Sequence, residues 1–324
     1  MKTLSISCLI CGLVLLGGVG IQAADQYPTR PIELVVPIGQ GGNADLGARI
    51  YAEDLGNTLK TRVNVVNRPG GSGIEGVSYV IGAEKDGYVL LHTPGTPLTI
   101  MPAISKEVTY DPLKDLIPIG HFASVPSLFA VRSDSPIKTL AEMIDYARNN
   151  PNKLRNAAAG IGNESYFNLT ILCSKIGIKI TTVPFSGGGD ALPALLGGHV
   201  DMATLSLTTL GPHIKAGKVR ALTITSKERA PDFPQIPTTA DLGYPYVNIV
   251  VWSGLFAAAG TPQPVTDVLV QAFQKVLKSP EVVKRAVKAG FTVEYKNPEE
   301  FRPFVEAQIR AIQEVVKFAN LEKK

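Results

Sequence analysis

Short apolar runs alternate with longer amphipathic segments along the first third of the chain. Aliphatic and β-branched runs predict strands, and apolar residues at helical spacing predict helices. The order is strand, helix, strand, helix, strand, at residues 32–36, 44–59, 63–67, 74–83 and 88–92. Alternation at this spacing predicts parallel strands joined by crossover helices, with ligands bound outside the carboxyl ends of the strands.

A second strand-helix series begins beyond residue 118. Thr139 and Glu142 have the spacing of a capping box and predict a helix start between strands at residues 128–132 and 155–158. The remaining expected strands are residues 178–183, 200–205, 219–225 and 249–256, and three helices follow them, the last at residues 298–318. The Pro-rich stretch 229–245 predicts an irregular surface segment. Two series fit the two domains that a chain of 324 residues suggests.

In each series, one strand leads through a glycine-containing loop into a helix. The first loop, residues 37–42, contains Pro37 and three glycines, and the second, residues 159–165, contains Gly160 and Gly162. Free backbone N–H groups and the positive end of the helix dipole converge at such a turn, so each loop predicts an anion-binding site. Because the loops are far apart in the sequence, we expect them in different domains.

The N-terminal segment has the pattern of an exported protein. Lys2 precedes an apolar stretch over residues 4–21, which ends at the small residues Ala23 and Ala24. This order predicts a signal peptide over residues 1–24 that is cleaved on export. An uncleaved membrane anchor of similar length is the alternative, but the Gly- and Cys-containing run and its small-residue end favour cleavage.

Charge, cysteine and histidine content argue against several classes of function. A formal net charge of +4 without a long Lys/Arg run gives no expected nucleic-acid surface. Cys8 and Cys11 lie in the predicted signal peptide, so Cys173 has no partner for an internal disulfide and is expected to be a small buried apolar residue. The histidines at positions 92, 121, 199 and 213 lack metal-ligand spacing, and we expect no metal.

The first loop also has an enzymatic interpretation. The residues from Gly39 to Ala44 fit G-x-G-x-x-A between a strand and a helix, and Arg68 follows the next strand, where a 2′-phosphate of NADP would sit. However, nicotinamide cofactors are scarce outside the cytoplasm, and the signal lacks a twin-Arg pair. The sequence also contains neither G-x-S-x-G nor a Walker phosphate loop. We therefore expect a binding protein with no cofactor and no catalytic residues.

A series of short motifs resembles those of a known family. The motifs include Val35-Val36-Pro37, Asn67-Arg68-Pro69-Gly70, Asp86-Gly87-Tyr88, Tyr110-Asp111-Pro112, Gly160-Ile161-Gly162, Val183-Pro184-Phe185, His213-Ile214-Lys215-Ala216-Gly217-Lys218 and Gly260-Thr261-Pro262. In this order they resemble the Bug family of periplasmic solute receptors, the extracytoplasmic component of tripartite tricarboxylate transporters. The resemblance implies a periplasmic location, a small carboxylate as ligand and membrane permease subunits as partners, and we expect a monomer.

The resemblance also implies a fold and its division into lobes. The expected fold is α/β with two lobes of the Venus-flytrap kind, each a mainly parallel sheet with flanking helices. Two strands would cross between the lobes near residues 117–123 and 219–225. Lobe 1 would then comprise residues 25–122 and 226–324, and lobe 2 residues 123–225.

By the same resemblance, backbone amides and ordered waters from the two loops would hold the ligand. The residues expected around it are Ile38, Gly39, Gln40, Gly41, Gly42, Asn43, Asp45, Thr93, Gly160, Gly162, Asn163, Glu164, Ser165, Tyr166 and Thr204. Thr93 and Thr204 are included because they fall at strand ends that should face the other lobe.

Four of these side chains leave the identity of the ligand open. Gln40 stands where relatives commonly have proline, and it adds a side-chain amide to the loop. Asp45 orients the loop, binds an ammonium or hydroxyl group of the ligand, or satisfies helix donors. Glu164 and Tyr166 stand where a small hydroxyl and a histidine are common. Glu164 either faces solvent in the first helical turn or points inward, where its charge would repel a second carboxylate.

These observations predict that the protein captures a small organic carboxylate between two lobes and delivers it to a tripartite transporter. A dicarboxylate, an amino acid and an aromatic acid all remain candidate ligands, the last because Tyr166 could line an aromatic pocket. A sensory receptor is an alternative role, since the binding step would be the same. An NADP-dependent oxidoreductase is the less favoured alternative.

Overall fold

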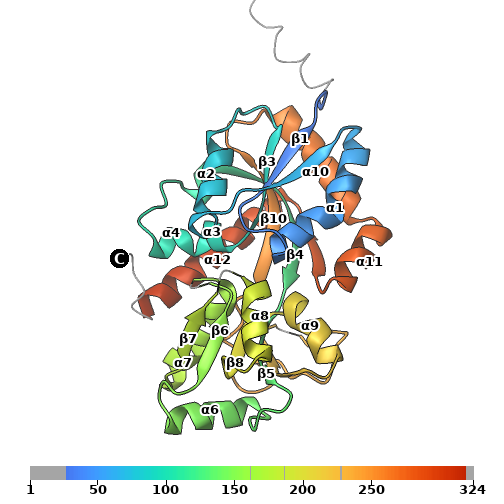
Figure 1. Cartoon of the computed structure of the whole chain (residues 1–324). Helices are drawn as coiled ribbons and strands as arrows, with labels where there is room; N and C mark the ends of the chain where they lie inside the picture. The colour runs from blue at the N-terminus through green and yellow to red at the C-terminus, as the bar shows by residue number, and fades with distance from the viewer. Residues whose placement is uncertain (1–26, 161, 186, 227, 319–324) are drawn as a thin grey trace, which may run out of the picture.

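The computed structural model describes residues 27–160, 162–185, 187–226 and 228–318, so the predicted signal peptide lies outside the described residues. The chain forms two lobes, each built around one β-sheet with helices packed on its faces (Figure 1). This confirms the predicted two-lobed α/β fold, but each sheet is mixed rather than mainly parallel, because strands remote in sequence pair antiparallel in both lobes. Among the described residues, no helix is both long and apolar enough to cross a membrane.

The first lobe contains a six-stranded sheet with the strand order β11-β4-β10-β3-β1-β2. Its strands are β1 (Ile32–Val36), β2 (Val63–Asn67), β3 (Val89–Pro94), β4 (Leu116–Val125), β10 (Val251–Ala258) and β11 (Thr292–Lys296). Its helices are α1 (Asn43–Leu59), η1 (Gly71–Gly73), α2 (Ile74–Gly82), α3 (Thr96–Thr99), α4 (Met101–Ile104), α5 (Pro112–Asp115), α10 (Gln263–Leu277), α11 (Pro280–Lys288) and α12 (Pro298–Phe318). β1 is parallel to β2 and β3, as the alternating pattern predicts.

The second lobe contains a five-stranded sheet with the strand order β7-β6-β8-β5-β9. Its strands are β5 (Ser127–Arg132), β6 (Arg155–Ala158), β7 (Thr181–Pro184), β8 (Met202–Ser206) and β9 (Val219–Ile224). Its helices are α6 (Leu140–Asn149), α7 (Glu164–Ile176), α8 (Gly188–Leu196) and α9 (Leu207–Lys215). At the predicted start of α6, the Thr139 hydroxyl accepts a hydrogen bond from the Glu142 N–H.

The strand β1, which lies between β3 and the edge strand β2, is apolar except for Glu33 because helices cover both faces of its sheet. Leu34 and Val36 pack with Tyr51 and Leu55 of α1, while Val35 points to the opposite face and joins the cluster that α2 and α12 cover. A strand buried on both faces needs a continuous aliphatic run, which is the pattern of parallel sheets between helices. Packing of this kind fixes β1, and it therefore fixes where the loop after β1 begins.

The strands β4 and β10 lie side by side and antiparallel down the middle of the molecule (Figure 1). β4 ends at Val125 in the first sheet, and β5 begins at Ser127 in the second, so a single residue, Pro126, separates the two sheets. The other connection enters β10 at Val251. Both connections between the lobes therefore lie next to each other, which is the arrangement of a hinge.

The second connection is not where the sequence places it. The expected crossing at residues 219–225 is β9, which pairs with β5 at the edge of the second sheet. Ile224 then forms a bridge to Thr238, and the chain remains on the second lobe until residue 249. We therefore propose that residues 126–249 form the second lobe, in place of the expected 123–225.

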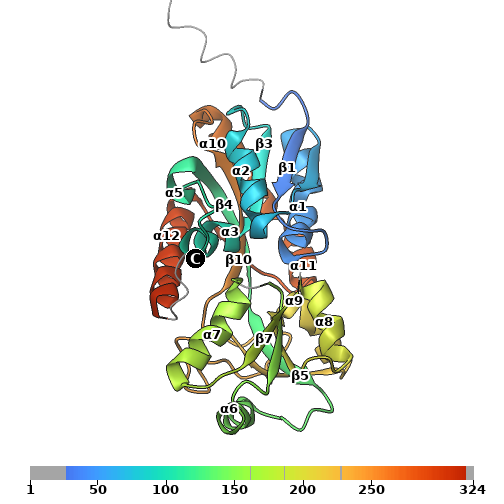
Figure 2. The same cartoon turned by 60° about the vertical axis from the view of Figure 1, so that its left-hand side comes forward.

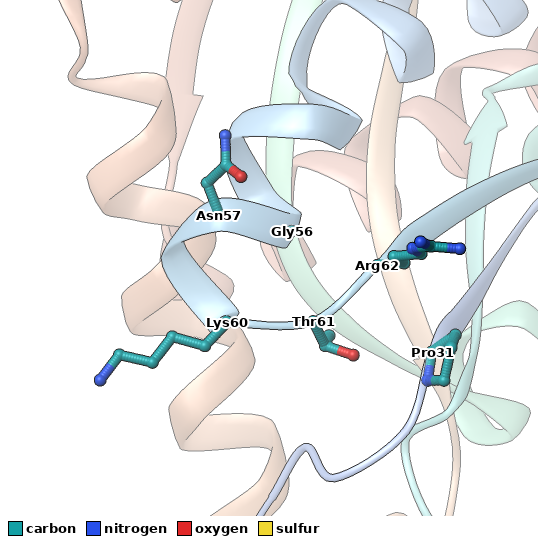
Figure 3. Close-up of a pocket in the computed structure, with 6 residues that line it drawn as sticks. All are labelled: Pro31, Gly56, Asn57, Lys60, Thr61 and Arg62. Atoms are coloured by element: carbon teal, nitrogen blue, oxygen red, sulfur yellow. The ribbon is translucent and has the colours of Figure 1, made fainter.

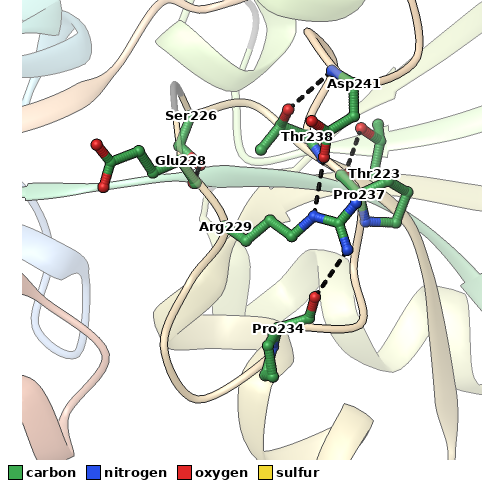
Figure 4. Close-up of polar contacts among 8 residues, drawn as sticks. All are labelled: Thr223, Ser226, Glu228, Arg229, Pro234, Pro237, Thr238 and Asp241. Carbon is green, nitrogen blue, oxygen red and sulfur yellow. Dashed lines mark hydrogen bonds and ion pairs between the residues drawn. The ribbon is translucent and has the colours of Figure 1, made fainter.

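Polar contacts keep this irregular segment, residues 228–241, on the second lobe. The participating residues are Thr223, Ser226, Glu228, Arg229, Pro234, Pro237, Thr238 and Asp241 (Figure 4). Arg229 Nε lies 2.9 Å from Asp241 Oδ2, and Thr223 Oγ1 of β9 donates to the carbonyl of Pro237 at 3.0 Å. Hydrogen bonds from Thr238 and from Arg229 lower the pKa of Asp241. Side-chain hydrogen bonds thus hold this segment in place of the backbone hydrogen bonds of a β-strand, and a hydrophobic pattern in the sequence does not reveal them.

Asn168 of α7 joins the second lobe to the start of the returning chain. It is fully buried, its Nδ2 donates to the carbonyl of Ile249 at 2.7 Å, and its Oδ1 accepts from the Ile249 N–H at 2.9 Å. One side chain thus satisfies both backbone groups of a buried residue directly before β10.

We expect Asn168→Ala to lower the free energy of unfolding by about 3 kcal/mol, because a buried N–H and a buried C=O lose their partners together. Urea unfolding monitored by circular dichroism measures this change. Asn57→Ala, at an exposed position of α1, is the matched control and should stay within about 0.5 kcal/mol of the unmodified protein. Equal effects of the two substitutions would contradict the role assigned to Asn168.

Candidate functional site

The two predicted loops lie at the junction of the lobes. The first loop, residues 37–42, joins β1 to α1, and the second, residues 159–163, joins β6 to α7. Both follow the carboxyl ends of parallel strands, where open α/β sheets bind ligands. Figure 2 shows α7 and α8 directly below the first lobe. We call the region between the two loops the interlobe site.

Contacts across the junction show that the lobes are closed on each other. Asn43, directly after the first loop, accepts hydrogen bonds from Ser206 Oγ at 3.3 Å and from the Thr208 hydroxyl. On the other lobe, Gly162 lies so close to α4 that a side-chain carbon there would be 2.9 Å from Ile104 Cδ1. Each loop thus ends in contact with the opposite lobe.

Asp45 fixes the shape of the first loop. It is 4% exposed, and its Oδ2 accepts from the Gly41 N–H at 2.9 Å. Its Oδ1 accepts from Arg49 Nε at 3.0 Å and from Asn67 Nδ2 at 2.9 Å. Asn67 Nδ2 also donates to the Ile38 carbonyl at 3.0 Å, so both ends of the loop are held. Of the expected roles of Asp45, orientation of the loop is the one this geometry supports.

The pKa of Asp45 reflects these contacts. Burial by itself raises the pKa of the carboxyl group, but hydrogen bonds from Arg49, Gly41 and Asn67 outweigh burial, and the pKa lies below its usual value. The carboxylate is therefore charged at neutral pH, and its charge is balanced by Arg49 within the protein.

Among the described residues, no side chain caps the N-terminus of α1. Gly42 occupies the N-cap position with extended backbone and contributes no side-chain acceptor. Gly39 and Gly41 have open space where a side chain would be, and Gly41 adopts φ +76°, which favours glycine. The first-turn N–H groups of a helix have no partners within the helix. The end of α1 is therefore available to an anion.

The second loop is organised differently because Asn163 caps α7. Asn163 Oδ1 accepts from the Tyr166 N–H at 2.7 Å, and its Nδ2 donates to the Ala159 carbonyl at 2.5 Å. Gly160 and Gly162 have φ values of +98° and +90°. The capped turn leaves fewer amides of α7 for a ligand than the uncapped turn leaves in α1.

Glu164 points inward at the lobe junction, which is one of the two orientations that the sequence left open. It is 3% exposed, and its Oε2 accepts from Thr96 Oγ1 of the first lobe at 2.9 Å. Burial raises the pKa of Glu164 to about 7, and hydrogen bonds from its own N–H and from Thr96 counteract only part of this increase. Within the described residues its Oε1 has no hydrogen-bond partner.

The other expected site residues differ in what they offer a ligand. Thr93 and Thr204 are fully buried, and their hydroxyl groups contact the Pro94 carbonyl at 3.0 Å and Asn156 Nδ2 at 3.0 Å. The Ser165 hydroxyl lies 2.7 Å from that of Ser127. The structure brings together Ile38, Gly39, Gln40, Gly41, Gly42, Asn43 and Asp45 in the first loop and its helix start, and Gly160, Gly162, Asn163, Glu164, Ser165 and Tyr166 in the second.

Sequence analysis did not identify some residues that shape the interlobe site. Thr96, Ser206 and Thr208 make the contacts between the lobes, and Asn67 and Arg49 hold Asp45. Asn67 begins one of the recognised motifs, so its place in that motif was an available signal. The contacts of Thr96 had no local signal, because they depend on the other lobe.

Other features of the surface lie apart from the interlobe site. A hollow of about 490 Å³ is lined by Pro31, Gly56, Asn57, Lys60, Thr61 and Arg62 (Figure 3). It lies where α1 ends and β2 begins, at the opposite end of the strands from the first loop. Arg68, the expected partner of an NADP phosphate, pairs instead with Glu33 at 3.2 Å and lies over the ring of Tyr79. The described residues contain no cluster suited to a metal ion.

Two α/β lobes, adjacent connections and a glycine-containing loop of each lobe at the junction define the class of two-lobed solute-binding proteins. A sequence profile described as the tripartite tricarboxylate transporter family receptor matches residues 47–321. The chain belongs to this family, and the resemblance found in the sequence is confirmed. The family consists of solute-binding receptors rather than enzymes.

Solved structures of similar proteins agree with this assignment. The periplasmic binding protein BugD is 35% identical, with coverage of 92% of this chain and 100% of that chain and a TM-score of 0.84. Rpa4515 of R. palustris with adipate is 28% identical, with coverage of 92% and 100% and a TM-score of 0.87. MatC (Rpa3494) from Rhodopseudomonas palustris with bound malate is 31% identical, with coverage of 90% and 100% and a TM-score of 0.83.

We expect Asp45→Ala to lower the free energy of unfolding by about 2 kcal/mol at pH 7, because the Gly41 and Asn67 donors lose a buried acceptor. The charge of Asp45 stabilises the protein only above the pKa of the unfolded carboxyl group, and this stabilisation is lost as pH falls through the lowered native pKa. The difference should therefore shrink at pH 3, as measured by urea unfolding. Asp267→Ala, exposed on α10, is the control, and a pH-independent difference for Asp45→Ala would contradict this account.

Proposed function

We propose that this protein captures a small organic carboxylate between its lobes in the periplasm and delivers it to the membrane permease subunits of a tripartite tricarboxylate-type transporter. The observation that carries the proposal is the uncapped start of α1, with the preceding loop held rigid by Asp45. Family membership and neighbours solved with adipate and malate support the same conclusion. Export would follow from the signal peptide expected at residues 1–24.

Backbone amides suit the recognition of a carboxylate. Their positions are fixed by the fold, so no side-chain entropy is lost when the ligand binds, and the positive end of the helix dipole adds attraction. Gly39 and Gly41 allow a ligand to approach the main chain because no side chain intervenes. Arg49, the cation adjoining this loop, already pairs with Asp45 at 3.0 Å. Neutral amide donors are thus the main attraction offered to the anion.

The site residues are assigned to two groups in this proposal. The first loop from Ile38 to Asn43 would bind one carboxylate group through its main chain, with Gln40 providing an adjustable side-chain amide. The second loop would bind the remainder of the ligand through Gly160, Asn163 and Tyr166. Tyr166 is half-buried, and its ring lies edge-on to that of Phe167 with 5.8 Å between the ring centroids, so it offers part of a ring face to a ligand.

A thermal-shift screen of the mature protein against mono-, di- and aromatic carboxylates and amino acids would identify the ligand class. We expect small carboxylates, with malate and adipate of the two solved relatives as first candidates, to raise the melting temperature, because a ligand that binds only the folded state stabilises it by mass action. Ionised Glu164 would repel a second carboxylate, so dicarboxylates should stabilise the protein most at pH 6, below the pKa of Glu164. NADPH is included as a comparison. A shift with NADPH and none with any carboxylate would overturn the proposed function.

A second prediction concerns the space in front of the first loop. Gly39→Val should weaken dicarboxylate binding at least tenfold, because the added side chain would stand between the ligand and the main chain of the loop. The free energy of unfolding should change by less than about 1 kcal/mol, because the position is exposed and nothing lies within 4 Å of an added side-chain carbon. Calorimetric titration with malate measures the affinity. Gly82→Val, at an equally open position at the end of α2, is the matched control and should bind normally. Unchanged affinity in Gly39→Val would place the ligand elsewhere.

A further inference from the structure

Glu164 is a carboxyl group enclosed between the two lobes. It begins α7 in the second lobe, whereas its partner Thr96 begins α3 in the first. The backbone beneath it belongs to Gly95, where an added side-chain carbon would lie 2.7 Å from Glu164 Oε1 and 2.6 Å from Trp252 Nε1. Trp252, in β10 directly after the connection between the lobes, is itself 1% exposed. The group therefore owes its enclosure to residues of the opposite lobe.

The surroundings of Glu164 must change when the lobes separate. The hydrogen bond from Thr96 and the cover from Gly95 and Trp252 come from the first lobe, so opening would remove them and admit water. A carboxyl group in water has an ordinary pKa, while one enclosed without a counter-charge is harder to ionise. The two positions of the lobes thus differ in their affinity for a proton at this side chain.

The elements around Glu164 provide no positive charge to balance it. The residues of α3, α4 and β10 include no ionisable side chain. α7 has Tyr166 and Cys173, which carry no positive charge, and its cation Lys175 lies near the far end of the helix. On β3 and β4, burial lowers the pKa of His92 to about 3 and of His121 to about 4, so both are neutral at physiological pH. Asp45 of α1 is negative and paired with Arg49. The unpartnered Oε1 is therefore uncompensated when it is ionised.

We propose that the protein takes up a proton when it closes on its ligand, and that Glu164 holds this proton between the lobes. The inference rests on the function proposed above, because it describes how the same site is regulated. The proton comes from solvent on closure, resides on the Glu164 carboxyl group and returns to solvent when the lobes open. Binding at neutral pH is then weaker than the amide contacts alone would allow.

The direction of the pH dependence follows from linkage. The pKa of Glu164 is about 7 in the closed protein and is expected near its ordinary value of 4.5 when the lobes are open. The closed state binds the proton more tightly, so affinity for the ligand is highest at low pH and falls as pH rises between these two values. With these values, affinity should fall about tenfold between pH 6 and pH 8 and change little above pH 8.

Calorimetric titration of the mature protein with malate and with adipate at pH 6, 7 and 8 tests the proposal. Glu164→Gln, which resembles the protonated group and can still accept from Thr96, should bind with nearly constant affinity and, with the two pKa values above, exceed the unmodified protein about 300-fold at pH 8. Titration of the ligand's own carboxyl groups is common to both proteins and cancels in this ratio. Glu281→Gln, at an exposed position in the first turn of α11, is the matched control and should retain the full pH dependence.

Titrations in two buffers of different ionisation enthalpy count the protons. At pH 6 the unmodified protein should take up about 0.9 proton more per ligand than Glu164→Gln. Parallel pH profiles and equal proton uptake in the two proteins would overturn the proposal, while the carboxylate-binding function would stand. If neither ligand binds at any pH, the proposed function fails for these ligands. The ¹³C carboxyl resonance of Glu164, assigned by its loss in Glu164→Gln, gives an independent measure: an ordinary titration midpoint in the free protein and a midpoint near 7 in the ligand-bound protein support the proposal, and equal midpoints in the two states overturn it.

Discussion

The pairing of β4 with β10 is the constraint on which the two-lobed arrangement depends. Both connections between the lobes leave the first sheet from these neighbouring strands, so the lobes share one narrow junction. Other contacts between the lobes, such as those at Asn43 and Glu164, are made by side chains. Such contacts can break when the lobes move apart, whereas the hydrogen bonds between β4 and β10 lie within one sheet and stay intact. The fold therefore permits the lobes to change their relative position while each sheet stays intact.

The two loops have opposite polar arrangements. In the first, a buried carboxylate shapes the loop from behind, and the start of α1 has no side-chain cap. In the second, Asn163 caps the helix and a buried carboxyl group faces the opposite lobe. Under the proposed function, an anionic group of the ligand would therefore fit the first loop better than the second. This asymmetry would give the ligand a preferred orientation between the lobes.

Much of the fold was predictable because it depends on local pattern. Aliphatic runs bounded by glycine and proline located β1, β2, β3 and β6, and the loops after β1 and β6 were identified from their glycines. The short edge strand β11 was missed, since its residues alternate only weakly in burial and its partner β4 is remote in sequence. The return of the chain to the first lobe was misplaced for a related reason. Contacts such as Arg229 with Asp241 hold an irregular segment that has no periodicity.

The positions of the two loops of the candidate site were predictable from the sequence, but the roles and ionisation of their carboxyl groups were not. Glycine spacing located both loops, whereas the roles of Asp45 and Glu164 depend on Asn67 and Thr96, which lie 22 and 68 positions away in the sequence. A carboxyl group has different chemistry when it is paired, enclosed or hydrated, and its neighbours in the fold decide among these states. Sequence alone gives the residue type and leaves that decision open.

The double hydrogen bond between Asn168 and Ile249 has a geometric consequence for the choice of ligand. The helix that carries the second loop at its start holds the interlobe connection little more than one turn later, so loop and connection form one rigid body. Any change in the distance between the two loops must then be matched by rotation about that connection. A longer dicarboxylate would leave the lobes at a wider angle than a shorter one. Under the proposed function, the chain length of the ligand would thus set the angle between the lobes that a membrane partner contacts.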